Sequence, residues 1–287
     1  MTDGTGLPEH IKRKPDVVCI GAQKSGTSWL HEMMDDRPDM WVPPFKEQHF
    51  FDHKFLPENR KWTGDHVRYQ VQLAREKTLR HNGEIDPKKA EYLDHVSAKP
   101  MFNGQWYQYV FSRAPMSSLC VDVTPEYSTI PEEGVEFVAK FLPRAKFIYL
   151  IRHPVARAMS QLNMNLSRAG TTLTTDDEWL QAAASDPEIA QRGDYAQYVP
   201  RWQRHFDEKR LLILPYGRIG AEPVALLRDI EEFVDVRPFE YNTPERVVSQ
   251  QKRQKMPQVV QDYFAEKFAD QVDFLRDHFG QAFLDQT

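Results

Sequence analysis

The sequence predicts an α/β fold in which helices cover both faces of a central parallel sheet. Short apolar runs typical of strands alternate with longer segments whose apolar residues recur at helical spacing. One strand-like run, "KFIYLI" at 146–151, is apolar almost throughout, as strands buried inside a parallel sheet are. Such sheets bind ligands at the carboxyl ends of their strands, so we expect the site there.

The first expected elements follow this alternation. "DVVCIGA" at 16–22 is rich in β-branched residues and predicts a strand, and "TSWLHEMMDD" at 27–36 has the apolar spacing of a helix. "SLCVDV" at 118–123 predicts a second strand and "VEFVAKFL" at 135–142 a helix. The run at 146–151 is then the third strand.

The remaining elements continue the pattern. Pro154 lies where a helix would begin, two residues after the third strand, and "VARAMSQLNMNL" at 155–166 continues that helix. "RLLILPY" at 210–216 predicts a fourth strand and "PVALLRDIEEFV" at 223–234 a further helix. The last helix, at 259–279, has one apolar face and is expected to pack on the sheet.

The length of the chain bounds its domain organisation. With 287 residues and 40% hydrophobic content, we expect a single domain over residues 1–287. The segment around 52–105 is rich in charged, histidine and aromatic residues and has weak periodicity. We expect it to be an insertion or a flexible cap over the site.

Composition argues against several classes of protein. No run approaches the roughly 18 apolar residues of a membrane helix, and the polar residues before the first strand do not resemble a secretory signal. The net charge of -5 argues against a general nucleic-acid binder. Cys19 and Cys120 lie in strand-like runs, which favours buried, reduced thiols. We therefore expect a cytoplasmic protein with no nucleic-acid partner and no membrane span.

The turn after the first strand, "GAQKSGTS" at 21–28, predicts an anion site. A strand, a glycine loop and a helix N-terminus point backbone N–H groups and the positive end of the helix dipole at a ligand. Gly21 and Gly26 have the spacing of a phosphate-binding P-loop, which together with the alternation predicts a P-loop-like three-layer fold. The residues expected to bind the anion are Lys24, Ser25, Gly26, Thr27 and Ser28.

The lysine of this loop is displaced from its usual place in a P-loop. Thr27 stands where the lysine would follow the second glycine, and Lys24 lies inside the bend instead. This position suits a donor with one short 5′ group better than a triphosphate. An ATP-dependent small-molecule kinase, with Asp122 aiding Mg²⁺, is the competing interpretation.

Two stretches resemble the sulfotransferases that use 3′-phosphoadenosine 5′-phosphosulfate (PAPS). "QKSGTSWL" at 23–30 is similar to their 5′-phosphosulfate loop, and "FIYLIRHPVARAMSQL" at 147–162 resembles their 3′-phosphate motif. The resemblance assigns Arg152 and Ser160 to the 3′-phosphate. An arginine fork and a hydroxyl group suit a phosphate dianion.

Further segments resemble the heparan-sulfate branch of that family and its bacterial relatives. "FKEQHFFD" at 45–52 is similar to a segment whose glutamate is the catalytic base, which assigns that role to Glu47. His49 is the competing base, because its pKa lies near neutrality. The resemblance also implies that Lys24 and the loop amides stabilise the leaving 5′-phosphate, with no metal required.

A late basic run, "QQKRQKMP" at 250–257, partly resembles the second 3′-phosphate loop of the family. Lys252 matches the family's lysine, whereas Arg253 replaces a glycine and Gln254 an arginine. Lys252 and Arg253 are therefore candidate ligands of the donor, and a solvated charge run is the alternative. The cysteine-linked hairpin of Golgi heparan-sulfate enzymes is absent, which argues against a polysaccharide acceptor.

The resemblance implies a PAPS-dependent sulfotransferase. It would move a sulfuryl group to an acceptor hydroxyl or amine and release adenosine 3′,5′-bisphosphate (PAP). The acceptor class stays open between a sugar, a glycopeptide, a lipid and a small metabolite. A noncatalytic nucleotide-binding module is the alternative from another class.

Overall fold

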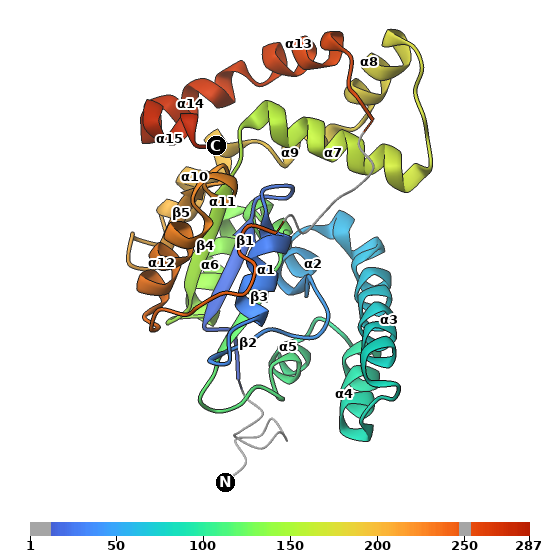
Figure 1. Ribbon diagram of the computed structural model, residues 1–287, viewed down its shortest axis with the longest axis vertical. Coiled ribbons are helices and arrows are strands. Elements are labelled where there is room, and N and C mark those ends of the chain that lie inside the picture. The colour runs from blue at the N-terminus through green and yellow to red at the C-terminus, as the bar shows by residue number, and fades with distance from the viewer. Residues whose placement is uncertain (1–12, 247–253) are drawn as a thin grey trace. The chain divides into compact units, whose positions relative to one another are not determined.

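A computed structural model describes residues 13–246 and 254–287 (Figure 1). Its sheet has five strands in the order β2-β3-β1-β4-β5, and β3 pairs in parallel with both β1 and β2. This confirms the predicted α/β fold with a central parallel sheet. The strands are β1 (Val17–Gly21), β2 (Met40–Trp41), β3 (Leu119–Val123), β4 (Lys146–Ile151) and β5 (Leu211–Pro215).

The chain divides into two compact units. Of the described residues, unit 1 comprises 13–20 and 34–147, and unit 2 comprises 21–33, 148–246 and 254–287. A single domain over the whole chain therefore stays a prediction. Each unit is described by itself below.

Unit 1 contains β2, β3, most of β1 and a set of helices. These are α2 (Phe50–Phe55), α3 (Thr63–Asn82), α4 (Pro87–Ser97), α5 (Gly104–Val110), α6 (Glu132–Phe141) and the 3₁₀ turns η2 (Pro57–Lys61) and η3 (Pro125–Thr129). In the core, Phe50 stacks on Tyr107 at 4.3 Å, and Phe51 meets Tyr127 edge-on at 4.9 Å. This aromatic packing fixes α2, the helix that follows Glu47.

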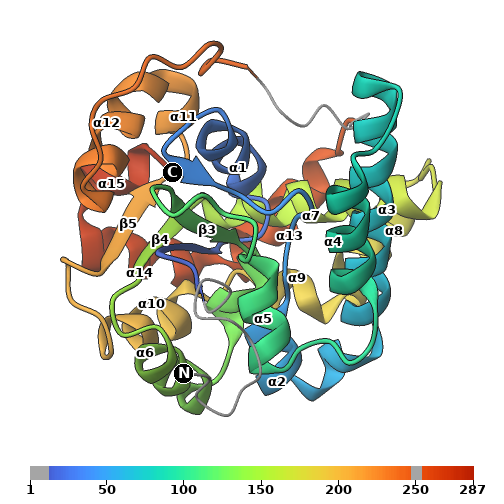
Figure 2. The ribbon, with the colours of Figure 1, turned by 90° about the horizontal axis from the view of Figure 1, so that it is seen from below.

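The segment at 52–105 is largely helical, although its periodicity is weak. Its longest element, α3, packs along α4, and the two helices lie side by side in Figures 1 and 2. α3 buries only a narrow stripe that includes Val67, Val71 and Ala74. So narrow a stripe explains why no clear amphipathic pattern is visible in the sequence. A capping role for the segment stays a prediction.

Unit 2 contains β5 and the helices that follow β1 and β4. These are α1 (Thr27–Asp35, whose last two residues belong to unit 1), α7 (Pro154–Ala169), α8 (Asp176–Ser185), α9 (Pro187–Gln191), α10 (Tyr195–Gln203), α11 (Arg218–Ala221), α12 (Pro223–Val234), α13 (Gln258–Lys267), α14 (Ala269–Phe279) and α15 (Gln281–Asp285). Proline at the first turn of α7 confirms the predicted start of that helix.

The last predicted helix is wrong in two respects. Residues 259–279 form two helices, α13 and α14, with Phe268 between them, and α13 packs on α7 and α8 instead of on the sheet. The apolar face of α13, with Val260 and Phe264 fully buried, fits against Leu162 of α7 and Trp179 of α8. The amphipathic pattern was read correctly, but it does not specify which surface covers the apolar face.

Two predictions from composition concern the cysteines and membrane-spanning helices. Cys19 and Cys120 are buried thiols, as expected, and burial raises the pKa of the Cys120 thiol to about 12. Among residues 13–246 and 254–287, no helix is long and apolar enough to cross a membrane. The cytoplasmic location stays a prediction.

Candidate functional site

The glycine loop connects β1 to α1 and lies in unit 2. Lys24 and Gly26 adopt left-handed backbone conformations, with φ of 70° and 86°. A Cβ atom on Gly26 would lie 3.1 Å from the ring of Tyr216 and would overlap the side chain of Ile219. Glycine is therefore required at position 26 for both its conformation and its lack of a side chain.

Arg152 at the end of β4 contacts this loop. Its Nη1 donates a hydrogen bond of 3.0 Å to the backbone oxygen of Lys24, a residue 128 positions away in the sequence. The guanidinium carbon lies 4.6 Å from the centroid of the Tyr216 ring, and the Tyr195 hydroxyl donates to the Arg152 carbonyl oxygen at 3.0 Å. The two motifs proposed from the sequence for opposite ends of a nucleotide are thus brought together within unit 2.

The hydroxyl residues expected to bind the sulfuryl donor differ in how deeply they are buried. Ser25 is fully buried and Thr27 is 6% exposed, while Ser28 lies half-buried in the first turn of α1. Ser160 lies half-buried on α7, the helix that begins two residues after Arg152. Helix N-termini, hydroxyl groups, lysine and arginine are the donors that bind phosphate and sulfate oxygens, so this set fits an anionic nucleotide.

Part of the late basic run can be placed. Lys252 and Arg253 lie outside the described residues. Gln254, where the family has an arginine, accepts a hydrogen bond from the Leu173 amide at 3.2 Å and donates to the Thr171 carbonyl oxygen at 2.7 Å. Gln254 therefore fastens the turn after α7.

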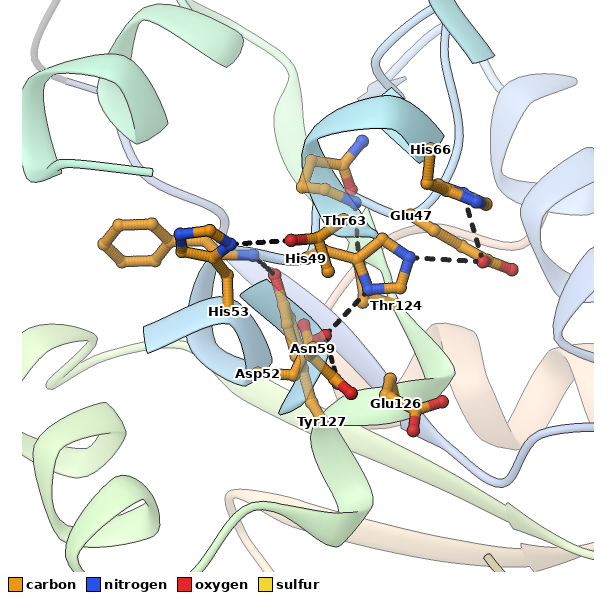
Figure 3. A network of polar contacts seen from close by, with 12 residues as sticks. Glu47, His49, Asp52, His53, Asn59, Thr63, His66, Thr124, Glu126 and Tyr127 are labelled. Carbon is orange, nitrogen blue, oxygen red and sulfur yellow. Dashed lines mark hydrogen bonds and ion pairs between the residues drawn. The ribbon is translucent and has the colours of Figure 1, made fainter. Parts of the chain in front are cut away.

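Glu47 lies in unit 1, in the loop before α2, at one end of the network in Figure 3. Glu47 and His49 are both in the left-handed region, with φ of 59° and 52°. The Oε2 atom of Glu47 is 3.5 Å from Nε2 of His49 and 3.5 Å from Nε2 of His66. Strained backbone of this kind at two nearby polar residues is typical of functional sites.

A buried carboxylate orients His49. The Nδ1 atom of His49 is 2.9 Å from Oδ2 of Asp52, which is fully buried in the first turn of α2. Asn59 donates a second hydrogen bond to the same oxygen at 2.9 Å. Asp52, His49 and Glu47 therefore form a line of polar contacts that leads from the interior to a carboxylate whose side chain is 27% exposed.

These contacts set the protonation of the pair. Burial alone would raise the pKa of Glu47, but the hydrogen bond and charge of His49, with smaller contributions from Lys46 and His66, lower it to about 2. Burial would lower the pKa of His49, but the charge and hydrogen bond of Asp52, together with Glu47, raise it to about 10. At neutral pH the pair is an imidazolium next to a carboxylate.

Asp122 anchors the backbone on both sides of His49. Its two oxygens accept hydrogen bonds from Thr124 (2.6 Å), Tyr107 (2.7 Å) and Tyr127 (3.0 Å). The Thr124 hydroxyl accepts from the amide of residue 48 at 2.9 Å, and the Tyr127 hydroxyl accepts from the amide of residue 50 at 3.0 Å. Asp122 is therefore a structural anchor of the turn and does not present the free oxygens that a magnesium ligand needs.

Burial opposes the ionisation of Asp122, and its hydrogen bonds favour it. Burial raises the pKa of Asp122 to about 6, an effect that the hydrogen bonds from Thr124, Tyr107 and Tyr127 partly offset. The anchor thus depends on its three hydroxyl donors to remain ionised at neutral pH.

Several functional candidates were missed in the sequence. The H-x-x-D spacing of His49 and Asp52 places the two side chains on the same side of a helix turn, which is a usable signal. His66 is separated from Glu47 by α2, η2 and the start of α3, so no local pattern indicates it. Tyr195 and Tyr216 contact Arg152, although an aromatic residue alone does not predict such a role.

One group of side chains has the composition of a metal site. Donor atoms of Glu47, His49 and His66 all lie within 4.8 Å of one another. The expectation of a metal-free reaction therefore stays a prediction.

The comparisons with known proteins agree on one family. The model of the family described as "Sulfotransferase family" matches residues 15–241. Heparan sulfate glucosamine 3-O-sulfotransferase 3A1 of Mus musculus is 22% identical over 236 residues, which are 80% of this chain and 48% of that protein. Heparan sulfate glucosamine 3-O-sulfotransferase 5 of Mus musculus is 22% identical over 241 residues, 81% of this chain and 56% of that protein. The chain thus spans about half the length of these curated relatives.

Solved structures support the fold. A sulfotransferase from Alicyclobacillus acidocaldarius superposes with a TM-score of 0.66 at 20% identity, covering 92% of this chain and 95% of the other. The sulfotransferase domain from the curacin biosynthetic pathway gives a TM-score of 0.53 at 15% identity, covering 87% and 83%. At these identities the likeness shows the fold alone, and it confirms the predicted P-loop-like architecture.

Proposed function

The chain belongs to the sulfotransferase family, and we propose that it moves a sulfuryl group from PAPS to an acceptor hydroxyl or amine, releasing PAP. The observation that carries this proposal is the hydrogen bond from Arg152 to the Lys24 carbonyl oxygen. It places a guanidinium group suited to a 3′-phosphate against the loop suited to a 5′-phosphosulfate. A donor with charge at both ends fits this arrangement.

We assign donor binding to residues of unit 2. The amides at the start of α1 and the side chains of Lys24, Ser25, Thr27 and Ser28 would receive the 5′-phosphosulfate, and Arg152 and Ser160 the 3′-phosphate. As the bond between sulfur and the 5′-phosphate oxygen breaks, negative charge grows on that oxygen. Lys24 and the loop amides would stabilise this developing charge. Each such hydrogen-bond donor typically raises the rate by about a hundred- to a thousand-fold.

We assign proton removal to Glu47. The acceptor oxygen or nitrogen attacks sulfur in line with the leaving oxygen, and its proton passes to the Glu47 carboxylate. His49 is a poor base, because its Nδ1 bonds Asp52 and its pKa of about 10 keeps it protonated at neutral pH. The low pKa of Glu47 makes it a weak base. By analogy with loose phosphoryl transfer, in which little charge develops on the attacking oxygen early, a well-placed weak base suffices.

Asp52 and Asn59 position His49, and through it Glu47, in this scheme. Their hydrogen bonds fix the ring of His49, whose charge keeps Glu47 ionised between turnovers. Their effect on the acceptor is therefore indirect.

The kinase interpretation has less support. It needs Asp122 as a magnesium ligand, whereas the oxygens of Asp122 accept three hydroxyl hydrogen bonds inside unit 1. The family match also favours sulfuryl transfer.

A screen with ³⁵S-labelled PAPS tests the proposal. Sugars, glycopeptides, lipids and small alcohols and amines serve as acceptors, with glucosamine-containing sugars first because the relatives are named for them. Mass spectrometry identifies the product. Glu47→Gln should abolish transfer and keep PAP binding, whereas the exposed Glu58→Gln serves as the matched control. Transfer by Glu47→Gln at the normal rate would remove Glu47 from the base role.

A further inference from the structure

We propose that Glu47, His49 and His66 form a binding site for a divalent transition-metal ion such as Zn²⁺, and that the bound ion inhibits transfer by occupying the Glu47 carboxylate. The inhibitory half of this proposal rests on the proposed function. The binding half does not, because it follows from the arrangement of three side chains in unit 1.

The distances between the donor atoms suit a small cation. Zn²⁺ binds imidazole nitrogen and carboxylate oxygen at about 2.0–2.2 Å, so neighbouring donors on a tetrahedral ion lie about 3.4 Å apart. Oε2 of Glu47 is 3.5 Å from Nε2 of His49 and 3.5 Å from Nε2 of His66. The three donors lie within 4.8 Å of one another, so closure around an ion needs the histidine nitrogens to approach each other by at most about 1.4 Å.

The surroundings of His49 are those of a metal ligand. Histidines that bind metals donate their second ring nitrogen to a carboxylate or carbonyl group, which fixes the orientation of the ring. Nδ1 of His49 bonds the buried Asp52, and Asn59 fixes Asp52 in turn. Nε2 of His49 is thereby directed to Glu47, as Figure 3 shows. An ion bound there displaces the proton on Nε2 into solvent, so binding should tighten as pH rises.

Trp62 supports both histidine rings. Its ring meets His49 edge-on at 4.8 Å and His66 edge-on at 5.9 Å, and the two histidine rings are perpendicular at 4.7 Å. The donors are therefore held before any ion arrives, so little conformational entropy is lost on binding.

An ion would enter past the Glu47 carboxylate, because the Nε2 atoms of His49 and His66 are themselves buried. The side chains of Glu47 and His66 are 27% and 20% exposed, whereas His49 is 2% exposed and forms the floor. Three protein ligands leave one position of a tetrahedral ion for water. An ion there uses the Glu47 oxygen that would otherwise receive the acceptor's proton, so we expect inhibition.

The donor types predict which metals bind. Two imidazoles and one carboxylate favour Co²⁺, Ni²⁺, Cu²⁺ and Zn²⁺, whereas Mg²⁺ and Ca²⁺ prefer sites made of oxygen alone. Mg²⁺ is therefore the matched negative control.

Direct binding is measured first, on full-length protein without a polyhistidine tag after treatment with a chelator. Co²⁺ titration should produce a saturable visible absorption band, and Zn²⁺ should abolish that band by competition. His66→Ala should weaken Co²⁺ and Zn²⁺ binding at least about tenfold, since even the loss of a second-shell partner costs that much. His81→Ala, on the same helix and exposed, should bind as the wild type does.

Inhibition is measured second. The Zn²⁺ concentration that halves transfer should rise at least about tenfold in His66→Ala, with each protein compared with its own metal-free rate. Stabilisation by PAP reports that the variant is folded, and His66→Asn replaces His66→Ala if it is not.

Three results would overturn the proposal: no saturable Co²⁺ band, equal metal affinity in His66→Ala and His81→Ala, or Zn²⁺ binding without inhibition. If no acceptor is sulfated at all, the proposed function fails, and the Co²⁺ titration still decides the metal site.

Discussion

Tyr127→Phe removes one hydroxyl group from the anchor beneath Glu47 and leaves the ring in place. That hydroxyl donates to Asp122 at 3.0 Å and accepts from the amide of Phe50 at 3.0 Å. We expect a lower kcat and little change in PAP affinity, because the turn that carries Glu47 loses its fixed position while the donor-binding residues lie in unit 2.

The magnitude follows from the two lost contacts. A buried polar group left without its partner costs about 1–3 kcal/mol. The amide of Phe50 loses its acceptor, whereas Asp122 keeps the hydroxyls of Thr124 and Tyr107. The free energy of unfolding should therefore fall by about 2–4 kcal/mol, of which about 1–3 come from the unpaired amide and about 1 from the lost hydrogen bond to Asp122. A displacement of Glu47 by about 1 Å should lower kcat by about a hundred-fold.

Tyr92→Phe is the matched control. Tyr92 is also a buried tyrosine of unit 1, and its hydroxyl donates to the Val110 carbonyl oxygen at 2.6 Å without touching the turn at Glu47. Denaturant unfolding gives the stability of both variants, and labelled-PAPS turnover gives kcat. Tyr92→Phe should lose stability and keep kcat. If Tyr127→Phe also keeps kcat while losing stability, Asp122 does not position Glu47.

Three further predictions concern the donor site and the pH dependence of stability. Arg152→Lys keeps a charge but loses the planar fork that stacks on Tyr216, so calorimetry should show PAP binding weakened about 10- to 100-fold; unchanged affinity would exclude the assigned role. Gly217→Ala should weaken PAP binding about tenfold, a loss of about 1.4 kcal/mol. A Cβ at position 217 would overlap the carbonyl oxygen of Gln286, which accepts a hydrogen bond of 2.6 Å from the Gly217 amide, and so would displace the neighbouring Tyr216. Gly220→Ala is the control and should bind PAP normally, because a Cβ there meets no other atom. With a chelator present, protonated His49 should stabilise the fold fully below its ordinary pKa of 6.5, and this stabilisation should be lost as pH rises toward about 10. Over that range the free energy of unfolding should fall by at most about 1.4 kcal/mol per pH unit. Urea unfolding of His49→Asn should show a weaker dependence on pH in this range, and an unchanged dependence would contradict the raised pKa.

Sequence patterns predicted the parts of the site that are local in the chain. The glycine loop and Arg152 each end a strand, and strand ends of a parallel sheet lie at one edge, so their meeting follows from topology. Gly26 was expected from the spacing of a P-loop, and its φ of 86° gives the physical reason for a glycine there.

The parts that sequence patterns did not predict depend on tertiary packing. His66 reaches Glu47 because α3 begins beside the turn before α2, and no spacing rule relates the two positions. The second helix of the 259–279 region, α14, lies against α10. This contact could not be predicted, because an amphipathic pattern does not say which element covers the apolar face. The partners of Asp122 are hydroxyl groups whose tyrosine rings look like ordinary core residues in the sequence.

Thermal shift with two nucleotides tests the central claim, binding of a bisphosphorylated adenosine donor, most directly. PAP at 100 times its Kd should stabilise the protein by about 2.7 kcal/mol. Arg152→Ala should lose most of that stabilisation at the same concentration, and ATP with Mg²⁺ should stabilise the wild type less than PAP does. Stronger stabilisation by ATP with Mg²⁺, or none by saturating PAP, would contradict the account.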